Sequence, residues 1–259
     1  MPYQTLTVSE DHRVAVITFN RPEKRNAISM SLIAELMEAL DHLAKSDVRV
    51  VIITGAGKSF CAGMDLEELK SLTGRSREES QRDSETMARL FRGVYDFPKP
   101  LIAAVNGPAI AGGCGIATLC DFTLASTEAK FGYTEVRIGF LPAIVSTFLL
   151  RQIGEKHARD LLMTGRIISA EEAARIGLIN EVLSPERLIP RAHELAAELI
   201  ENSPASLAAT KQLLNSFAVD DLNADIQAAV DANADIRTTA DFREGVTSFL
   251  EKRKPVWKS

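Results

Sequence analysis

The chain has 259 residues, of which 46% are hydrophobic and 25% charged, and its formal net charge at pH 7 is -5. This composition is typical of a soluble globular protein that can bury a large core. The negative charge argues against non-specific binding to nucleic acid or to anionic membranes, so neither is expected as a partner. No apolar run approaches the ~20 residues that span a bilayer, and the first residues lack the order of a secretion signal. The three cysteines form no CxxC pair, which favours free thiols in a reducing cytoplasm.

The first half of the chain alternates short apolar runs with helical patterns. An amphipathic helix is predicted over residues 31–46. The strands predicted around it cover residues 14–20, 48–55, 101–107 and 121–126. Short β-rich runs that alternate with helices indicate an α/β core. The polar segment 67–92 is interpreted as a pair of solvated helices, and a mobile cover over a site is the alternative.

From about residue 155 onward the pattern is helical. Ser169 and Glu172 stand at the spacing of a capping box, and Asp241 and Glu244 have a similar spacing. The Ser-Pro pairs at 184–185 and 203–204 are typical of a helix cap followed by a first-turn proline. These helices have apolar faces, which pack either on the core or on a neighbouring subunit.

Several common motifs fail on their spacing. The GAGKS sequence at 55–59 has Ile52 where a phosphate-binding loop requires glycine. The first predicted strand is followed by RPEKRNA, which lacks the glycines of a dinucleotide-binding turn. The four histidines form no metal-binding pattern and no GxSxG sequence is present, so neither a metal site nor a serine hydrolase is predicted.

Two glycine-containing loops follow neighbouring predicted strands. The first carries FCAGMDL at 60–66 and the second carries AGG at 111–113, while FGYTE downstream supplies a lone carboxylate, Glu135. The simpler interpretation is that both loops are tight strand-to-helix connections that need small residues. The functional one is that each loop directs a backbone N–H at a common point, next to the positive end of a helix. An amide donor that faces a carboxylate suits proton transfer beside a carbonyl group.

Five segments, in order over nearly the whole chain, resemble the enoyl-CoA hydratase/isomerase (crotonase) superfamily. They are SFCAGMDLEEL, AAVNGPAIAGGCGIATLCDFTLAS, FGYTEVRIGFLP, LMTGRIISAEEAARIGLINEV and SFLEKRKPVW. The resemblance implies an α/β fold, with a spiral of ββα turns over residues 1–200 and a helical trimerisation region over 201–259. It implies homotrimers or hexamers and an acyl-CoA substrate. Coenzyme A enters as part of that substrate, and no separate cofactor is expected.

The resemblance also assigns roles to individual residues. It places the N–H groups of Met64 and Gly112 in an oxyanion hole and gives proton transfer to Glu135. It places five neighbouring residues along the substrate: Ala62, Gly63, Asp65, Leu66 and Gly113. Lys24 and Arg25 are expected near the nucleotide part of CoA, and Phe249 and Lys252 at the CoA of a neighbouring subunit. A solvated charge is the alternative role for Lys252.

Family hydratases commonly carry two glutamates, and the position of the first is Gly115 in this chain. Glu135 alone can hold a water and return its proton in one coupled step. It can equally move a proton between two carbons of the acyl chain. The run 135–146 is similar to a branch that contains methylglutaconyl-CoA hydratases, which favours hydration, although it can also simply shape the pocket wall.

The sequence therefore predicts a hydratase that adds water reversibly to an α,β-unsaturated acyl-CoA. A Δ3,Δ2-enoyl-CoA isomerase is the alternative, and a non-catalytic acyl-CoA-binding protein is the second alternative. The acyl group is left open. Arg82, Arg89 and Arg92 in the polar segment are interpreted as solvent-facing, and pairing with a second carboxylate on the substrate is their alternative role.

Overall fold

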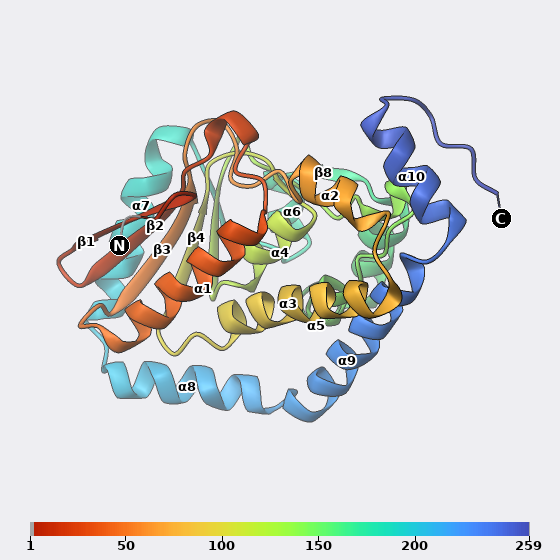
Figure 1. The fold of residues 1–259 in the computed structure, drawn as a ribbon. Coiled ribbons are helices and arrows are strands. Elements are labelled where there is room, and N and C mark those ends of the chain that lie inside the picture. The colour runs from red at the N-terminus through yellow and green to blue at the C-terminus, as the bar shows by residue number, and fades with distance from the viewer. Residues whose placement is uncertain (1–2, 259) are drawn as a thin grey trace.

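A six-stranded sheet occupies the left of Figure 1 in this computed structural model, which describes residues 3–258. Its strand order is β1-β2-β3-β4-β6-β9, in which β1 pairs antiparallel to β2 and the other neighbours are parallel. The predicted strands are confirmed as β2, β3, β4 and β6. No strand was predicted at β1, whose sequence LTVSED is mostly polar. The strands run over Leu6–Asp11, Val14–Phe19, Val50–Gly55, Leu101–Val105, Phe122–Ser126 and Glu181–Leu183.

The central strands are apolar on both sides because helices cover both faces of the sheet. All six residues of β3 are buried. Its Ile52 packs in the apolar cluster under α7 (Pro185–Ile200), whereas the next residue, Ile53, packs in the main core with α1 (Met30–Lys45). Alternate side chains of a strand point to opposite faces, so a continuous apolar run marks a strand between two helical layers.

A smaller second sheet positions Gly112 and Glu135, which line an apolar cavity. It consists of β5 (Ala109–Ile110), β7 (Lys130–Gly132) and β8 (Ile167–Ser169) in the order β5-β7-β8. The strands β5 and β7 are parallel, so their carboxyl ends lie side by side. Helix α4 (Gly112–Leu119) begins after β5, and the short 3-10 helix η2 (Glu135–Ile138) begins after β7.

The polar segment after β3 folds into two helices, but only part of it is solvated. Helix α3 (Arg77–Tyr95) begins at a complete capping box between Ser76 and Glu79. One face of α3 is buried against α1, α4, α5 and α9, so the prediction of a solvated helix pair is wrong for this helix. The remaining elements of this half are η1 (Pro22–Lys24), α2 (Leu66–Leu72), α5 (Ala143–Thr164) and α6 (Ala170–Arg175).

Three helices follow α7 and wrap round the core, as Figure 1 shows. They are α8 (Pro204–Ser216), α9 (Val219–Ile236) and α10 (Ala240–Leu250). Ser169, Ser184 and Ser203 stand at the predicted starts of α6, α7 and α8, but Thr239 caps α10, so the capping spacing at Asp241 was wrong. The predicted boundary at residue 200 falls where α7 ends, and a division into two domains there stays a prediction.

Helices α9 and α10 return to the core and close one side of the cavity. Helix α9 packs on α3 and α5, and α10 packs on α2 and η2. Asn233, Arg237 and Phe249 therefore line the same cavity as residues from the first 200 positions. Within residues 3–258, no helix has the length and apolarity that a membrane crossing needs.

Candidate active site

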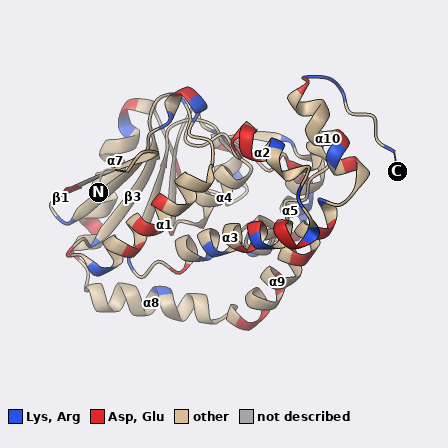
Figure 2. Ribbon diagram, in the orientation of Figure 1, with Lys and Arg blue, Asp and Glu red and all other residues tan. Residues whose placement is uncertain are grey.

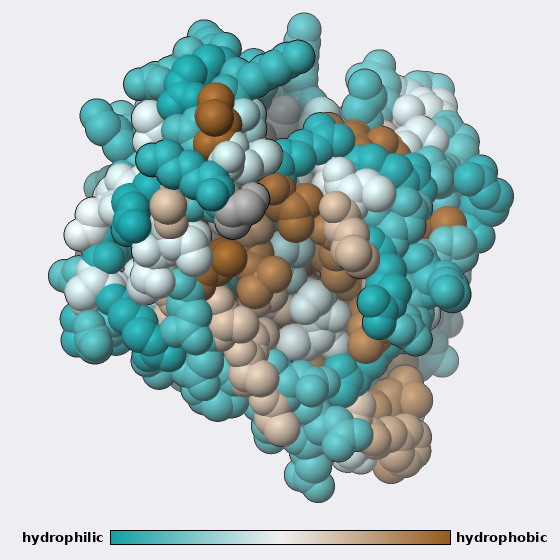
Figure 3. Space-filling view, turned by 90° about the vertical axis from the view of Figure 1, so that its right-hand side faces the viewer, coloured by the Kyte–Doolittle hydropathy of each residue, from teal (hydrophilic) through white to brown (hydrophobic). Residues whose placement is uncertain are grey.

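A cavity of about 150 Å³ lies where α3, α4, α5, η2 and α10 meet. Its walls are mostly apolar, and Figure 3 shows hydrophobic surface gathered in a hollow on this side of the molecule, surrounded by hydrophilic residues. An apolar cavity with a few polar groups is the usual form of a small-molecule site. The polar or backbone groups that reach it belong to Met64, Gly112, Thr134, Glu135, Asn233 and Arg237.

Glu135 is the buried acid of this cavity. It begins η2 directly after β7, and 9% of its surface is exposed. Its Oε2 atom has no hydrogen-bond partner among the described residues. Burial in apolar surroundings disfavours the charged carboxylate and raises the pKa of Glu135 to about 7, although a hydrogen bond from its own backbone N–H opposes the rise. A carboxyl group that titrates near neutral pH can both accept and return a proton.

The loop that carries Met64 is held in place by two neighbouring segments. The N–H of Ile28 donates to the carbonyl of Gly63 at 2.7 Å, and the N–H of Asp65 donates to the carbonyl of Ile28 at 2.8 Å. Met64 pairs with Ile28 as an isolated parallel bridge, a pattern in which the Met64 N–H points away from Ile28. No backbone acceptor for this N–H is found within residues 3–258. Met64 lines the cavity, and its N–H is left without a backbone acceptor among the described residues.

The second available amide is that of Gly112, the first residue of α4. First-turn N–H groups have no acceptor inside their own helix. The preceding residue, Ala111, has φ 52° and ψ -125°, a backbone conformation that residues with a side chain rarely adopt. Hydrogen bonds hold it there, because its N–H donates to the Gly132 carbonyl at 2.7 Å and its own carbonyl accepts from Gly115 at 3.1 Å. This strained residue sets the direction of the Gly112 N–H.

The two loops run side by side, as the sequence predicted. The N–H of Ile110 donates to the carbonyl of Cys61 at 2.9 Å, and Cys61 forms an isolated parallel bridge with Ala109. A Cβ atom on Gly63 would lie 3.3 Å from the Ala111 Cβ, so the loops touch at the point where glycine stands. Loop contact brings the Met64 and Gly112 amides to one cavity with Glu135.

Apolar side chains fill the space beside Gly115, the position at which family hydratases carry the first glutamate. A Cβ atom at this position would lie 2.7 Å from Cγ1 of Val145 and 3.2 Å from the ring of Phe91. Both side chains line the cavity. Because the space is filled with apolar atoms, the site has Glu135 as its only carboxylate lining the cavity among the described residues.

Of the other substrate contacts predicted near the two loops, two line the cavity and three do not. Ala62 and Gly63 line the cavity. Gly113 lies behind it, because a Cβ atom there would lie 2.5 Å from the Cys61 carbonyl oxygen. The Asp65 carboxylate caps α2 and accepts from Arg21 Nη2 at 2.9 Å, so it is engaged within the protein. Leu66 is exposed at the start of α2.

The four residues predicted farther along CoA are all exposed. The Nζ atom of Lys24 lies 3.7 Å from Oε1 of Glu67, and the carbonyl of Arg25 accepts from the N–H of Ala62 at 3.1 Å. Both basic residues therefore stand beside the loop that carries Met64. Phe249 lines the cavity of its own chain, and Lys252 is exposed after α10. Contact of Phe249 or Lys252 with the CoA of a neighbouring subunit stays a prediction.

The run 135–146 supplies much of one cavity wall, the alternative role predicted for it from the sequence. Its residues there are Ile138, Phe140, Leu141, Ala143 and Ile144. Asn233 of α9 and Arg237, the residue directly after it, add polar groups, and no motif marks them in the sequence. Among the described residues no group of His, Cys, Asp and Glu side chains could hold a metal ion. The three cysteines are free and buried.

The arginines of the polar segment do not enter the cavity. Arg82 and Arg89 are exposed, as interpreted from the sequence. Arg92 forms an ion pair with Asp96 and also donates to Asn223 Oδ1 at 2.7 Å. These three arginines do not line the cavity as partners for a second substrate carboxylate.

Comparisons with known proteins agree with this geometry. The family model described as enoyl-CoA hydratase/isomerase matches residues 9–259. A protein from Thermus thermophilus, provisionally named an enoyl-CoA hydratase, is 47% identical over 95% of this chain and 98% of its own. The crotonyl-CoA hydratase of Syntrophomonas wolfei is 36% identical over 98% of both chains. A solved enoyl-CoA hydratase/isomerase from Xanthobacter autotrophicus superposes with a TM-score of 0.90 and 28% identity, covering 99% of this chain and 100% of its own.

These matches settle the family and the crotonase-type fold, whereas the narrower resemblance to methylglutaconyl-CoA hydratases stays a prediction. The paired amide loops, the buried Glu135 and the end-to-end similarity point to one conclusion. The chain belongs to the enoyl-CoA hydratase/isomerase family.

Proposed function

We propose that this chain adds water reversibly to the double bond of an α,β-unsaturated acyl-CoA. The observation that carries the proposal is the burial of Glu135, with one unpartnered oxygen, in the cavity that Met64 and Gly112 also line. Relatives named as enoyl-CoA and crotonyl-CoA hydratases support hydration as the reaction.

One residue can complete the reaction. The Glu135 carboxylate removes a proton from water, and the water oxygen bonds to the β-carbon as the double-bond electrons move toward the thioester. The Met64 and Gly112 N–H groups stabilise the negative charge on the thioester oxygen, where each such donor is typically worth about 3 kcal/mol. Glu135 then returns its proton to the α-carbon, so that one water has been added and the acid is regenerated.

A test uses a panel of straight-chain, branched and dicarboxylic enoyl-CoA thioesters in isotopically labelled water. We expect a labelled 3-hydroxyacyl-CoA from the wild-type chain and a loss of at least about 100-fold in kcat for Glu135→Gln. Glu128→Gln, at an exposed glutamate near the same sheet, is the matched control. A rearranged product without label would establish an isomerase instead. Tight thioester binding without turnover on any member would establish a binding protein.

The CoA part of the substrate has a candidate entrance beside η1. Lys24, Arg25 and Arg21 place three cationic side chains on the segment that contacts the Met64 loop. Cationic side chains suit the phosphates of a CoA nucleotide. We expect Lys24→Ala combined with Arg25→Ala to raise KM for the thioester with little change in kcat. An equal fall in kcat would contradict a role confined to CoA binding.

A homo-oligomer, either a trimer or a hexamer, would cover an apolar surface that one chain leaves exposed. Helix α8 has a single charged residue, as Figure 2 shows, and its Leu213, Leu214 and the following Phe217 are all exposed. Trp257 and Val256 near the C-terminus are further exposed apolar residues. Light scattering coupled to gel filtration measures the number of subunits in the particle. Leu214→Glu should reduce that number, and a monomeric wild-type protein would contradict the proposed oligomer. The buried free thiols suit a cytoplasmic location.

A further inference from the structure

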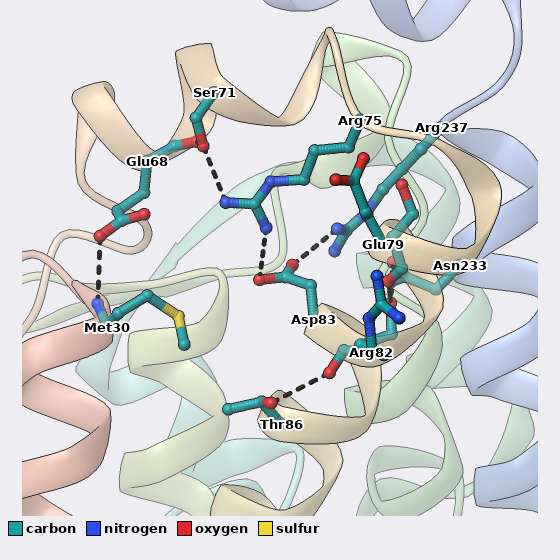
Figure 4. A network of polar contacts seen from close by, with 12 residues as sticks. Met30, Glu68, Ser71, Arg75, Glu79, Arg82, Asp83, Thr86, Asn233 and Arg237 are labelled. Atoms are coloured by element: carbon teal, nitrogen blue, oxygen red, sulfur yellow. Dashed lines mark hydrogen bonds and ion pairs between the residues drawn. The ribbon is translucent and has the colours of Figure 1, made fainter.

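A buried cationic cluster lies at the α9 side of the cavity. The Arg237 side chain is 2% exposed and lines the cavity. Its Nη1 donates to Oδ2 of Asp83 at 2.6 Å, while Nη1 of Arg75 donates to Oδ1 of the same carboxylate at 2.9 Å (Figure 4). Two guanidinium groups therefore share one carboxylate, so the cluster of these three side chains has a net positive charge.

One hydrogen-bond donor of the Arg237 guanidinium has no acceptor among the described residues. Its Nε atom is buried and has no hydrogen-bond partner within the described residues. Glu79, drawn nearby in Figure 4, already accepts from the N–H of Ser76 at 2.7 Å. Burying a charged group with an unpaired donor is unfavourable, and a bound ligand that supplies the missing acceptor is one explanation for such a group. The guanidinium also lies 5.0 Å from the ring centre of Phe140, another cavity residue.

Asn233 adds a second polar group on the same face of α9. It precedes Arg237 by four residues, one helical turn, and also lines the cavity. Its Oδ1 accepts from the Ser84 hydroxyl at 2.9 Å, which leaves its amide group directed to the cavity wall, where Nδ2 lies 3.5 Å from the Leu141 carbonyl oxygen. The rest of this wall is apolar. A simple hydrocarbon chain would fill it but would leave the Nε atom of Arg237 without an acceptor.

We propose that Arg237, assisted by Asn233, binds a carboxylate at the far end of the substrate's acyl chain. The preferred substrates are then enoyl-CoA thioesters of dicarboxylic acids. The inference rests on the proposed function for the identity of the ligand as an acyl-CoA. The other role open to the cluster is purely structural, in which Asp83 ties α3 to α9.

The test measures binding, so that it does not depend on turnover. Saturated CoA thioesters are titrated calorimetrically in pairs of matched chain length, one ending in a methyl group and the other in a carboxylate. We expect the carboxylate member of at least one pair to bind about tenfold more tightly or better, as charge-assisted hydrogen bonds do. An equal Kd within every pair would overturn the proposal.

Three variants separate recognition from structure. Arg237→Met should reduce the ratio of the two Kd values to near one. Asp83→Asn should keep or increase the ratio, because Arg237 remains and loses its competing carboxylate. Arg77→Met is the matched control, because Arg77 also joins α3 to α9, through Asp235 at 2.6 Å, but outside the cavity. If Asp83→Asn and Arg237→Met both fold and both bring the ratio of the two Kd values to near one, the cluster acts only by joining α3 to α9. That result would overturn the proposal.

The outcome is distinguishable from failure of the proposed function. Hydration without any preference for the carboxylate member leaves the hydratase standing and removes the Arg237 subsite. Preferential binding of the carboxylate member without hydration of its unsaturated form supports the subsite and removes the hydratase.

Discussion

Replacing Glu135 by glutamine should make the folded chain more stable at alkaline pH while abolishing its activity. The carboxylate of Glu135 is buried among apolar groups and one oxygen is unpartnered, so ionising it inside the fold costs free energy. Glutamine has nearly the same shape but no charge to bury. Catalytic groups commonly reduce stability in this way, because the site needs them in an unfavourable environment.

The magnitude follows from the pKa of Glu135, which burial raises from 4.5 to about 7. Each unit of pKa corresponds to about 1.4 kcal/mol, so the rise amounts to about 3 kcal/mol. Because the folded state binds the proton more tightly than the unfolded state, this group destabilises the fold as pH rises. The penalty is absent below 4.5, grows between 4.5 and about 7, and is complete above that range.

The assay is urea unfolding of wild type and Glu135→Gln at a series of pH values and one protein concentration, since assembly affects apparent stability. Relative to wild type, the free energy of unfolding of the variant should increase by about 3 kcal/mol between about pH 4.5 and about pH 8. Other titrating groups cancel, because both proteins contain them. The exposed Glu128→Gln variant should show no such shift. Parallel pH curves for wild type and Glu135→Gln would refute the reasoning.

Other predictions follow from the same site. Gly115→Ala should lower the free energy of unfolding by about 1–3 kcal/mol through the clash with Val145, and adding Val145→Ala should restore most of it in thermal melts. Ala111→Gly should relieve strain and leave stability equal or higher, yet lower kcat because the Gly112 amide is held less firmly. The thiols should resist alkylation until urea is added, since burial raises the pKa of Cys61 to about 12 and all three are buried; rapid labelling of the native chain would contradict their burial.

The predictable part of the site is the part that local sequence encodes. The amide donors at Met64 and Gly112 are backbone groups, and their positions follow from glycine-containing loops after strands. Parallel pairing of β5 with β7 then brings the end of FGYTE to the start of α4. The sequence therefore predicted three of the residues that line the cavity, together with four strands of the large sheet.

The unpredicted part depends on contacts between distant segments. Asp83 and Arg237 are 154 residues apart and lie on helices whose charged positions look like ordinary solvated faces. Nothing in either helix alone shows that the two side chains meet inside the protein. The buried face of α3 was missed for a related reason, because its serines at 80 and 84 have the polarity of surface residues but are enclosed by α9.

Gly115 and the raised pKa of Glu135 both concern the apolar part of the cavity. A carboxylate at position 115 would place a second charge near Glu135, and two like charges perturb each other's ionisation. With glycine there, Val145 and Phe91 fill the space, and apolar contacts replace a charge. The pKa of Glu135 is then raised by burial alone, without any neighbouring carboxylate. Val145 and Phe91 line the same cavity as Glu135, so they contribute to the apolar surroundings in which its carboxyl group titrates near neutral pH and can serve as both base and acid.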